Sequence, residues 1–353
     1  MPKTTKEVKK SAKNAVKTSD LARPTAPITI KIWGARGSLP SPLSPPAVEE
    51  EFRSLFDAFF EQGFKSKKDI SKFISSLPKH RLGGFGGNTL CVEVNSPKQQ
   101  LIIDAGSGIR LLGYEMMQGP CGRGTGEAHI LFTHFHWDHL VGLPFFTPLF
   151  IPGNKIHVYA VQDNLPEVFK VLFKKPYFPV SLEQLPAKIE YHRLTPREAK
   201  MFSDLKVTPY QLDHPDPCWG FRFENSEKVY SHCVDTECKR VSRAQLGPDL
   251  PLYQNVDLMV FDAQYTLVET LEKVDWGHAA ASMGIDLAIR EGIKKVLFVH
   301  NDPASSNEKI AAAEAQARRY YEAEIKSSKK SNLPFHEVDW AFAQEGDTYE
   351  LRK

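Results

Sequence analysis

The sequence predicts an α/β fold in which layers of strands and helices share a common core. Two observations support this prediction. Short apolar runs of strand length alternate along the chain with segments whose apolar residues recur at helical spacing. Several of the short runs also end directly in histidine or aspartate, and such strand ends gather at one edge of a layered sheet, where α/β folds place their sites.

Length and composition are those of an ordinary globular protein. The 353 residues suffice for one large domain, and the 41% hydrophobic and 25% charged fractions are typical of a chain with a substantial core. A formal net charge of +2 gives no basic excess of the kind that a dedicated nucleic-acid binder carries. The five cysteines form no Cys-x-x-Cys pair and no secretory segment begins the chain, so we expect a cytoplasmic protein. The sequence contains no apolar run of about 18 residues, so no membrane span is predicted.

The first part of the chain divides into a tail and the start of a domain. Residues 1–27 are rich in lysine and poor in large apolar side chains, which predicts a flexible tail before a single domain at 28–353. Residues 28–33 alternate as a first strand does. The following Gly-Ala-Arg-Gly-Ser segment, with Arg36 and Ser38, could present backbone N–H groups and a guanidinium to a phosphate, although a plain turn explains it equally well.

A helical insertion is expected at 47–80. Phe52, Phe56, Phe59 and Phe60 recur at helical spacing, and a second helix is expected at 69–76. These phenylalanines form an apolar stripe along one helix face, and such a stripe is expected to be buried against another surface. Three outcomes are open: packing on the parent domain, a lid over the site, or a homodimer contact.

The remaining pattern alternates strands with helices. Further strands are expected at 90–94, 100–103, 130–132, 155–161, 189–194, 205–212, 229–234, 259–261, 295–299 and near 334–338. Helices are expected at 109–117, 164–173, 279–290 and 307–324.

The densest group of chemistry-bearing residues follows the strand at 130–132. His134, His136, Asp138 and His139 leave that strand into a loop, where their side chains are free to turn toward one point. Imidazole nitrogens and carboxylate oxygens in this spacing suit zinc, manganese or iron. His214, Asp235 and His300 also stand directly after apolar strands, and more than four such ligands suggest two ions. These are seven candidate metal ligands.

The motif His-x-His-x-Asp-His followed by Leu-Val-Gly-Leu-Pro-Phe-Phe at 140–146 resembles the metal motif of the metallo-β-lactamase superfamily, in its RNase Z-like and cyclic-phosphodiesterase-like branch. The resemblance implies a four-layer αββα sandwich, here with a helical insertion after the first strand. It also implies a dinuclear metal centre, with zinc expected first and manganese or iron as alternatives. His134, His136 and His214 would hold one ion, Asp138, His139 and His300 the other, and Asp235 would bridge both.

The resemblance assigns further roles around the ions. Asp104, at a strand end before small residues, would brace the metal loop without binding metal. His278 matches a histidine that donates a proton to a leaving oxygen, so Asp138 and His278 are the expected catalytic residues. Arg36, Ser38 and Asn88 are expected to contact the substrate. Asn301 departs from the pattern, since relatives often carry a second histidine there.

The expected function is that of a metal-dependent phosphodiesterase acting on a small phosphodiester, first a cyclic nucleotide or another cyclic phosphate. The chain lacks the long Gly/Pro-rich arm with which RNase Z grips tRNA, and it lacks a basic excess. An RNase Z-like endonuclease or another nuclease acting on RNA or DNA is the alternative. A non-catalytic ligand-binding scaffold is a further alternative, and a homodimer is possible in each case.

Overall fold

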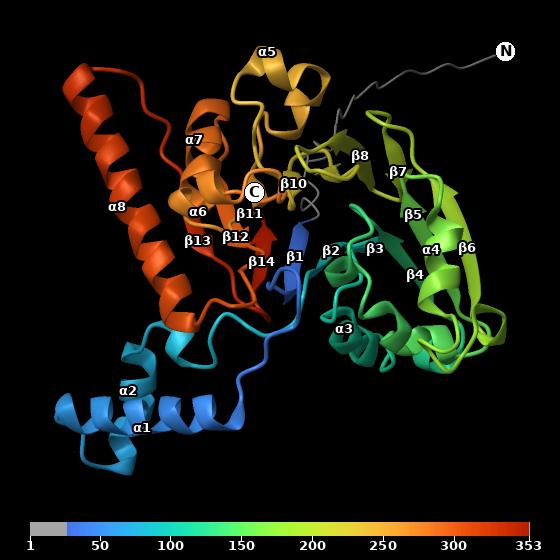
Figure 1. Ribbon diagram of the computed structural model, residues 1–353, viewed down its shortest axis with the longest axis horizontal. Helices are drawn as coiled ribbons and strands as arrows, with labels where there is room; N and C mark the ends of the chain where they lie inside the picture. Colours follow the sequence, from blue (N-terminus) through green and yellow to red (C-terminus); the bar gives the residue numbers. More distant parts are fainter. Residues whose placement is uncertain (1–26, 353) are drawn as a thin grey trace, which may run out of the picture.

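Two seven-stranded sheets form the centre of the protein in a computed structural model that describes residues 27–352 (Figure 1). The first sheet has the strand order β14 (Thr348–Leu351), β1 (Ile28–Gly34), β2 (Cys91–Ser96), β3 (Gln99–Ile103), β4 (Glu127–Leu131), β5 (Lys155–Ala160) and β6 (Lys188–Arg193). The second has the order β13 (Asp339–Phe342), β12 (Lys295–Val299), β11 (Leu258–Asp262), β10 (Val229–Cys233), β9 (Trp219–Glu224), β8 (Leu205–Gln211) and β7 (Lys200–Phe202). Strands β3 to β6 are parallel to one another, and so are β10 to β13.

Successive strand residues point to opposite sides of a sheet, so each sheet has two faces that can carry apolar side chains. The two sheets stack with one such face of each turned toward the other. One face of each sheet contributes to a shared core, in which Ile30 and Ile32 of β1 are clustered with Phe221 of β9 and Tyr230 of β10. The opposite faces bury apolar side chains beneath helices. The four-layer αββα sandwich expected from the sequence is therefore confirmed.

Helices cover both outer faces and fill the connections. Ile109 and Leu112 of α3 (Ile109–Met116) and Phe169 of α4 (Leu165–Leu172) pack on the first sheet. Ile285 of α7 (Ala281–Glu291) and Ile310 of α8 (Asn307–Ser331) pack on the second. Two short helices, α5 (Arg243–Leu246) and α6 (Leu267–Glu272), lie in the connections between strands of the second sheet.

The insertion forms the two expected helices, α1 (Pro45–Glu61) and α2 (Ile70–Ser76), which protrude from the sandwich (Figure 1). Phe59 packs within the insertion, its ring centroid 5.2 Å from that of Phe73. Phe52, Phe56 and Phe60 remain 57, 62 and 64% exposed, and α1 has no buried residue. The stripe therefore does not pack on the parent domain, the first of the three outcomes considered.

Several expected boundaries differ from the observed ones. The closing strand expected near 334–338 is wrong: that segment is irregular, β13 follows it at Asp339–Phe342, and β14 was missed. Both strands have only four residues, and pairing with β12 and β1 defines them more than their own composition does. The expected tail lies outside the described residues apart from its last position, Pro27. Within residues 27–352, the structure has no helix long and apolar enough to cross a membrane.

Candidate metal centre

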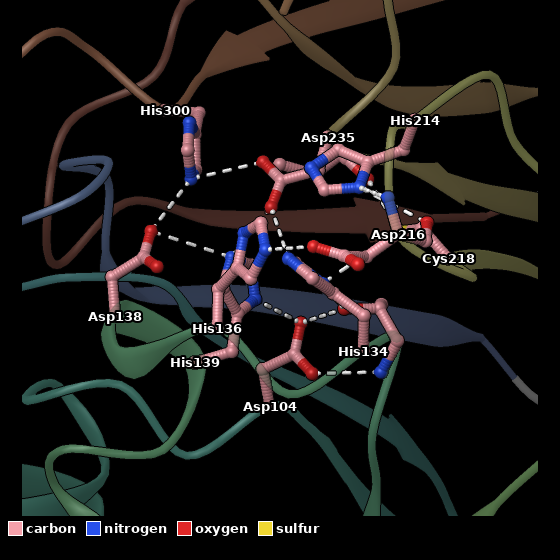
Figure 2. Close-up of polar contacts among 12 residues, drawn as sticks. Asp104, His134, His136, Asp138, His139, His214, Asp216, Cys218, Asp235 and His300 are labelled. Atoms are coloured by element: carbon pink, nitrogen blue, oxygen red, sulfur yellow. Dashed lines mark hydrogen bonds and ion pairs between the residues drawn. The ribbon is translucent and has the colours of Figure 1, made fainter. Parts of the chain in front are cut away.

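Loops at the ends of strands from both sheets bring the seven candidate ligands together (Figure 2). Four of them follow β4 in the first sheet, and the other three follow β8, β10 and β12 in the second. Their nitrogen and oxygen atoms form two groups, each with all its atoms within 4.8 Å of one another. The groups are His134, His136, His214 and Asp235, and Asp138, His139, Asp235 and His300. Asp235 belongs to both groups, as the resemblance implies for a bridging ligand.

Unusual backbone conformations occur at the strand ends that carry the site. Ser38, Asp104, Asp235 and His300 have φ angles of 58°, 60°, 63° and 66°, in the left-handed region that non-glycine residues rarely adopt. Each such residue costs on the order of 1–3 kcal/mol and persists only where its surroundings hold it. The turn at each strand end therefore directs these side chains into the shared site, and the surrounding fold supplies the energy to hold it.

The buried atoms at the centre fit a divalent cation. Nε2 of His134 and Nε2 of His139 lie 3.1 and 2.7 Å from Oδ2 of Asp235, yet neither nitrogen has a hydrogen-bond partner of acceptable geometry. Nε2 of His214 and Oδ1 of Asp235 are also buried without such a partner. Buried polar atoms seldom stay unsatisfied, since each costs on the order of 1–3 kcal/mol. Buried imidazole nitrogens and carboxylate oxygens that converge in this way form the ligand set of zinc, manganese or iron.

The histidines and carboxylates at the centre shift one another's pKa values. Burial alone would lower the pKa of His300, but the carboxylates of Asp235 and Asp138 raise it to about 10. Burial alone would raise the pKa of Asp138, but His139 and His300 hold it well below its usual range. A cation bound to these imidazoles would replace their protons and would be stabilised by the same carboxylates. Metal binding would therefore release protons.

Asp104 anchors the loop that follows β4, and its own carboxylate is fully buried. Its Oδ1 accepts the backbone N–H of Thr133 at 2.9 Å, and its Oδ2 accepts the Thr133 hydroxyl at 2.9 Å. Oδ2 also lies 2.8 Å from Nδ1 of His139. A proton on Nδ1 leaves Nε2 of His139 free to bind a cation, which is the usual arrangement of a metal-binding histidine and its carboxylate.

His278 lies at the edge of the same site. Its Nδ1 is 2.9 Å from Oδ2 of Asp262, and its ring stacks on that of His300 with centroids 4.9 Å apart. Asp262, at the end of β11, also accepts the backbone N–H groups of Gln264 and Ala279. The carboxylate therefore fixes the orientation of His278.

The three residues expected to contact the substrate occupy different positions. The buried Arg36 guanidinium donates to the carbonyl oxygens of Gly86, Asp302 and Ser305, which favours a role in bracing these loops over the expected substrate contact. Asn88 donates to Oε1 of Glu345 at 2.6 Å and its carbonyl accepts the Ser107 hydroxyl, so its amide is also engaged within the protein.

Ser38 alone of the three lies against a candidate ligand. Its backbone N–H donates to Oδ2 of Asp138 at 2.7 Å. Asn301, the departure from the family pattern, is buried, and its carbonyl accepts the N–H of Gly37 at 2.9 Å. This contact ties the His300 loop to the loop that carries Ser38.

Four residues around the site received no role from the sequence. Asp262 holds His278, and Oε1 of Gln264 lies 2.7 Å from Nδ1 of His300. Oδ2 of Asp216 lies 2.9 Å from Nε2 of the more exposed His136, and Glu237 accepts the N–H of Gly277 at 2.7 Å. Asp262 and Gln264 stand at the end of an apolar strand. The candidate ligands were predicted from the same sequence pattern, which could therefore have indicated these two residues as well.

Comparison with known proteins identifies the family. The model of the β-lactamase superfamily domain matches residues 99–301, which is more than half of the chain and includes every candidate ligand. The chain belongs to the β-lactamase superfamily.

Relatives within the superfamily include ribonuclease Z of Azobacteroides pseudotrichonymphae. It is 24% identical over 238 residues, which cover 58% of this chain and 80% of the relative. Among solved structures, yeast PDE1 superimposes with a TM-score of 0.59 at 14% identity and covers 93% of this chain and 100% of its own. The short form of human tRNase Z gives a TM-score of 0.53 at 14% identity, with 91% and 98% covered. The expected membership of a metal-dependent hydrolase family with a metallo-β-lactamase fold is confirmed.

Proposed function

We propose that this superfamily member is a phosphodiesterase that uses two divalent cations to hydrolyse a small phosphodiester, with a cyclic nucleotide or another cyclic phosphate as the first candidate. The observation that carries the proposal is the pair of overlapping ligand groups that share Asp235, with His278 at their edge. The proposed assignment gives His134, His136 and His214 to one cation and Asp138, His139 and His300 to the other. Zinc is the expected metal, and manganese or iron would also suit these donors.

Two cations in this donor set would lower the pKa of the hydrolytic water and neutralise charge on the phosphodiester. The chain's own residues position the rest. The Ser38 N–H fixes Asp138, and Asp104 fixes His139, so the ligands are held before a substrate arrives. Such preorganisation lowers the reorganisation needed during reaction.

His278 is the proposed general acid. Hydrolysis of a phosphodiester expels an alkoxide, which leaves faster when a proton is transferred to it. A proton on Nδ1 held by Asp262 leaves Nε2 as the atom that exchanges a proton with the leaving oxygen.

An aromatic surface beside the metal loop supports a nucleotide as substrate. Trp137, between two candidate ligands in sequence, has an exposed side chain, and it lines a groove of 310 Å³ with Phe135 and Leu140. An exposed indole offers a stacking face to a base. The groove also carries few charged groups, which suits a single nucleotide better than a long phosphate backbone.

An RNA endonuclease is the second candidate function. Its support comes from the sequence relatives, since ribonuclease Z of Clostridium perfringens is 24% identical over 271 residues and 84% of its length is covered.

The test of the function is a side-by-side substrate screen with the full chain reconstituted with Zn²⁺ or Mn²⁺. Bis-p-nitrophenyl phosphate, cyclic mononucleotides and a short RNA would be compared at equal enzyme concentration. We expect turnover of the small diesters and little cleavage of the RNA, and the reverse preference would establish the nuclease. Asp138→Ala should lower turnover by more than about 100-fold, and unchanged rates in that variant would reject the mechanism.

The role of His278 can be tested by varying the leaving group. His278→Ala should slow hydrolysis of a cyclic nucleotide, with its alkoxide leaving group, by about 100-fold or more. It should slow release of p-nitrophenolate much less, because that anion needs no proton. Asp262→Asn should show the same difference between substrates in weaker form. Equal losses on both substrates would show that His278 does not act as the acid.

A further inference from the structure

A second group of histidines lies on the first sheet, apart from the metal centre. His157 of β5 is paired in register with Glu190 of β6 and with His129 of β4. His192 follows two residues after Glu190 on β6, which is the edge strand of the sheet (Figure 1). The side chains of residues two apart on a strand share one face, so Glu190 and His192 point to the same side as His157.

Three of these side chains already form a triangle of ligand atoms. Nδ1 of His157 lies 3.1 Å from Nε2 of His192 and 3.3 Å from Oε2 of Glu190, and the remaining side measures 4.0 Å. Ligands bound to zinc at 2.0–2.1 Å in tetrahedral geometry are about 3.4 Å apart. The triangle therefore has the size of three corners of a zinc site.

Neighbouring rings hold the triangle in place. The His129 ring stacks on His157 with centroids 4.7 Å apart, and the Tyr159 ring stacks on His192 at 4.6 Å. Lys188 pairs with Oε1 of Glu190 at 2.7 Å, while Oε2 is the oxygen that faces the imidazoles. The arrangement is built before any ligand binds, which lowers the entropic cost of binding.

The cluster is also open to solvent on one side. The side chains of His157, Glu190 and His192 are 14, 29 and 32% exposed, so a cation can enter and a water can complete its coordination. None of the three residues is a candidate ligand of the catalytic centre, and their atoms share no group with it.

We propose that His157, Glu190 and His192 bind an additional divalent transition-metal cation of the zinc class. Three protein ligands and a solvent-open fourth position form a site that binds more weakly than the buried centre. The cation joins β5 to the edge strand β6, and binding to the folded state alone stabilises that edge by mass action.

The experiment counts metal ions in the full chain. The protein would be stripped with a chelator, dialysed against buffered free Zn²⁺ and analysed for zinc per chain, with His192→Gln and Glu190→Gln as variants. His336→Gln is the matched control, since His336 belongs to neither the cluster nor the metal centre and its Nε2 lies 3.0 Å from the Ile293 carbonyl oxygen. We expect the wild type and the control to bind one zinc more than either variant.

A second readout is thermal stability under saturating Zn²⁺. The zinc-dependent rise in Tm should be larger in the wild type than in His192→Gln, while phosphodiesterase turnover is the same in both. Equal zinc counts in all four proteins would overturn the proposal. The count is taken as a difference between variants, so it holds whatever the catalytic centre hydrolyses. If His192→Gln fails to fold, the nearly isosteric Glu190→Gln variant decides between the outcomes.

Discussion

Replacing Asp104 by asparagine should weaken metal binding without moving the backbone. Asparagine tolerates the left-handed conformation that Asp104 adopts at φ 60°, so the turn is kept. The amide oxygen can still accept a hydrogen bond from the Thr133 N–H. The NH₂ group, however, then faces Nδ1 of His139, from which the Asp104 carboxylate accepts a hydrogen bond. His139 is driven to the tautomer protonated on Nε2, the atom that faces Asp235 and the proposed cation.

The expected magnitude follows from this change of tautomer. Loss of a carboxylate behind a metal-binding histidine lowers metal affinity or activity by about 10- to 100-fold, which corresponds to about 1.4–2.8 kcal/mol. The loss should fall on the cation held by Asp138, His139 and His300 and should spare the other one. Asp339→Asn, at an exposed position at the start of β13, controls for the loss of one negative charge.

The assay is competition between the protein and a calibrated zinc chelator, carried out in the His192→Gln background so that only the two binding steps of the proposed centre are followed. Asp104→Asn should weaken one step by the stated factor, and far-UV circular dichroism should show retained secondary structure. Two binding steps with wild-type affinities in Asp104→Asn would refute the bracing role of Asp104 and the proposed tautomer of His139.

Three further outcomes follow from the structure. In Gly37→Ala the new Cβ would overlap the imidazole of His300. Turnover should fall by more than about tenfold because His300 is displaced, while the Tm changes little. Wild-type turnover would contradict this packing. Arg36→Lys keeps the charge but cannot satisfy all three carbonyl oxygens, and should lower the free energy of unfolding by about 1–3 kcal/mol in urea titrations. Burial alone would raise the pKa of Glu269, but hydrogen bonds from Thr266 and Lys309 lower it to about 2, so its contribution to stability is present above pH 4.5 and lost as the pH falls toward 2. The Tm difference between metal-free wild type and Glu269→Gln should therefore shrink over that range, and a constant difference would contradict the assignment.

The sequence predicted the clustered candidate ligands better than the residues that support them. His134 to His139 stand within six residues after one strand, and His214, Asp235 and His300 each follow an apolar strand, so the edge of the sheets could be inferred from local pattern. That Asp235 lies between the two groups could not, since it depends on how two sheets stack. The resemblance to a family supplied that step.

The roles of the supporting residues were not predicted because the residues they contact are distant in the chain. Asp262 contacts a histidine 16 residues away, and Gln264 one 36 residues away. An aspartate at a strand end has the same sequence signal whether it binds a cation or holds a histidine. The burial of Arg36 was not predicted for a similar reason. Without knowledge of its carbonyl partners, an arginine in a glycine-rich turn is expected to be exposed and to contact a phosphate.

The insertion illustrates another limit. Helical spacing of the phenylalanines correctly predicted α1, but amphipathicity alone does not say what covers the apolar face. Phe59 is covered within the insertion, whereas Phe56 is not. The pattern thus identifies the helix and not its neighbour.

The division of the centre between the two sheets has a mechanical consequence. Residues 28–193 supply nearly the whole first sheet and residues 200–342 the second, and the candidate ligands come from both. A cation bound as proposed would be held by residues of both sheets, so its release would weaken the contact between the two halves of the chain. The proposed centre would then serve both hydrolysis and the cohesion of the two sheets through the same ligand atoms.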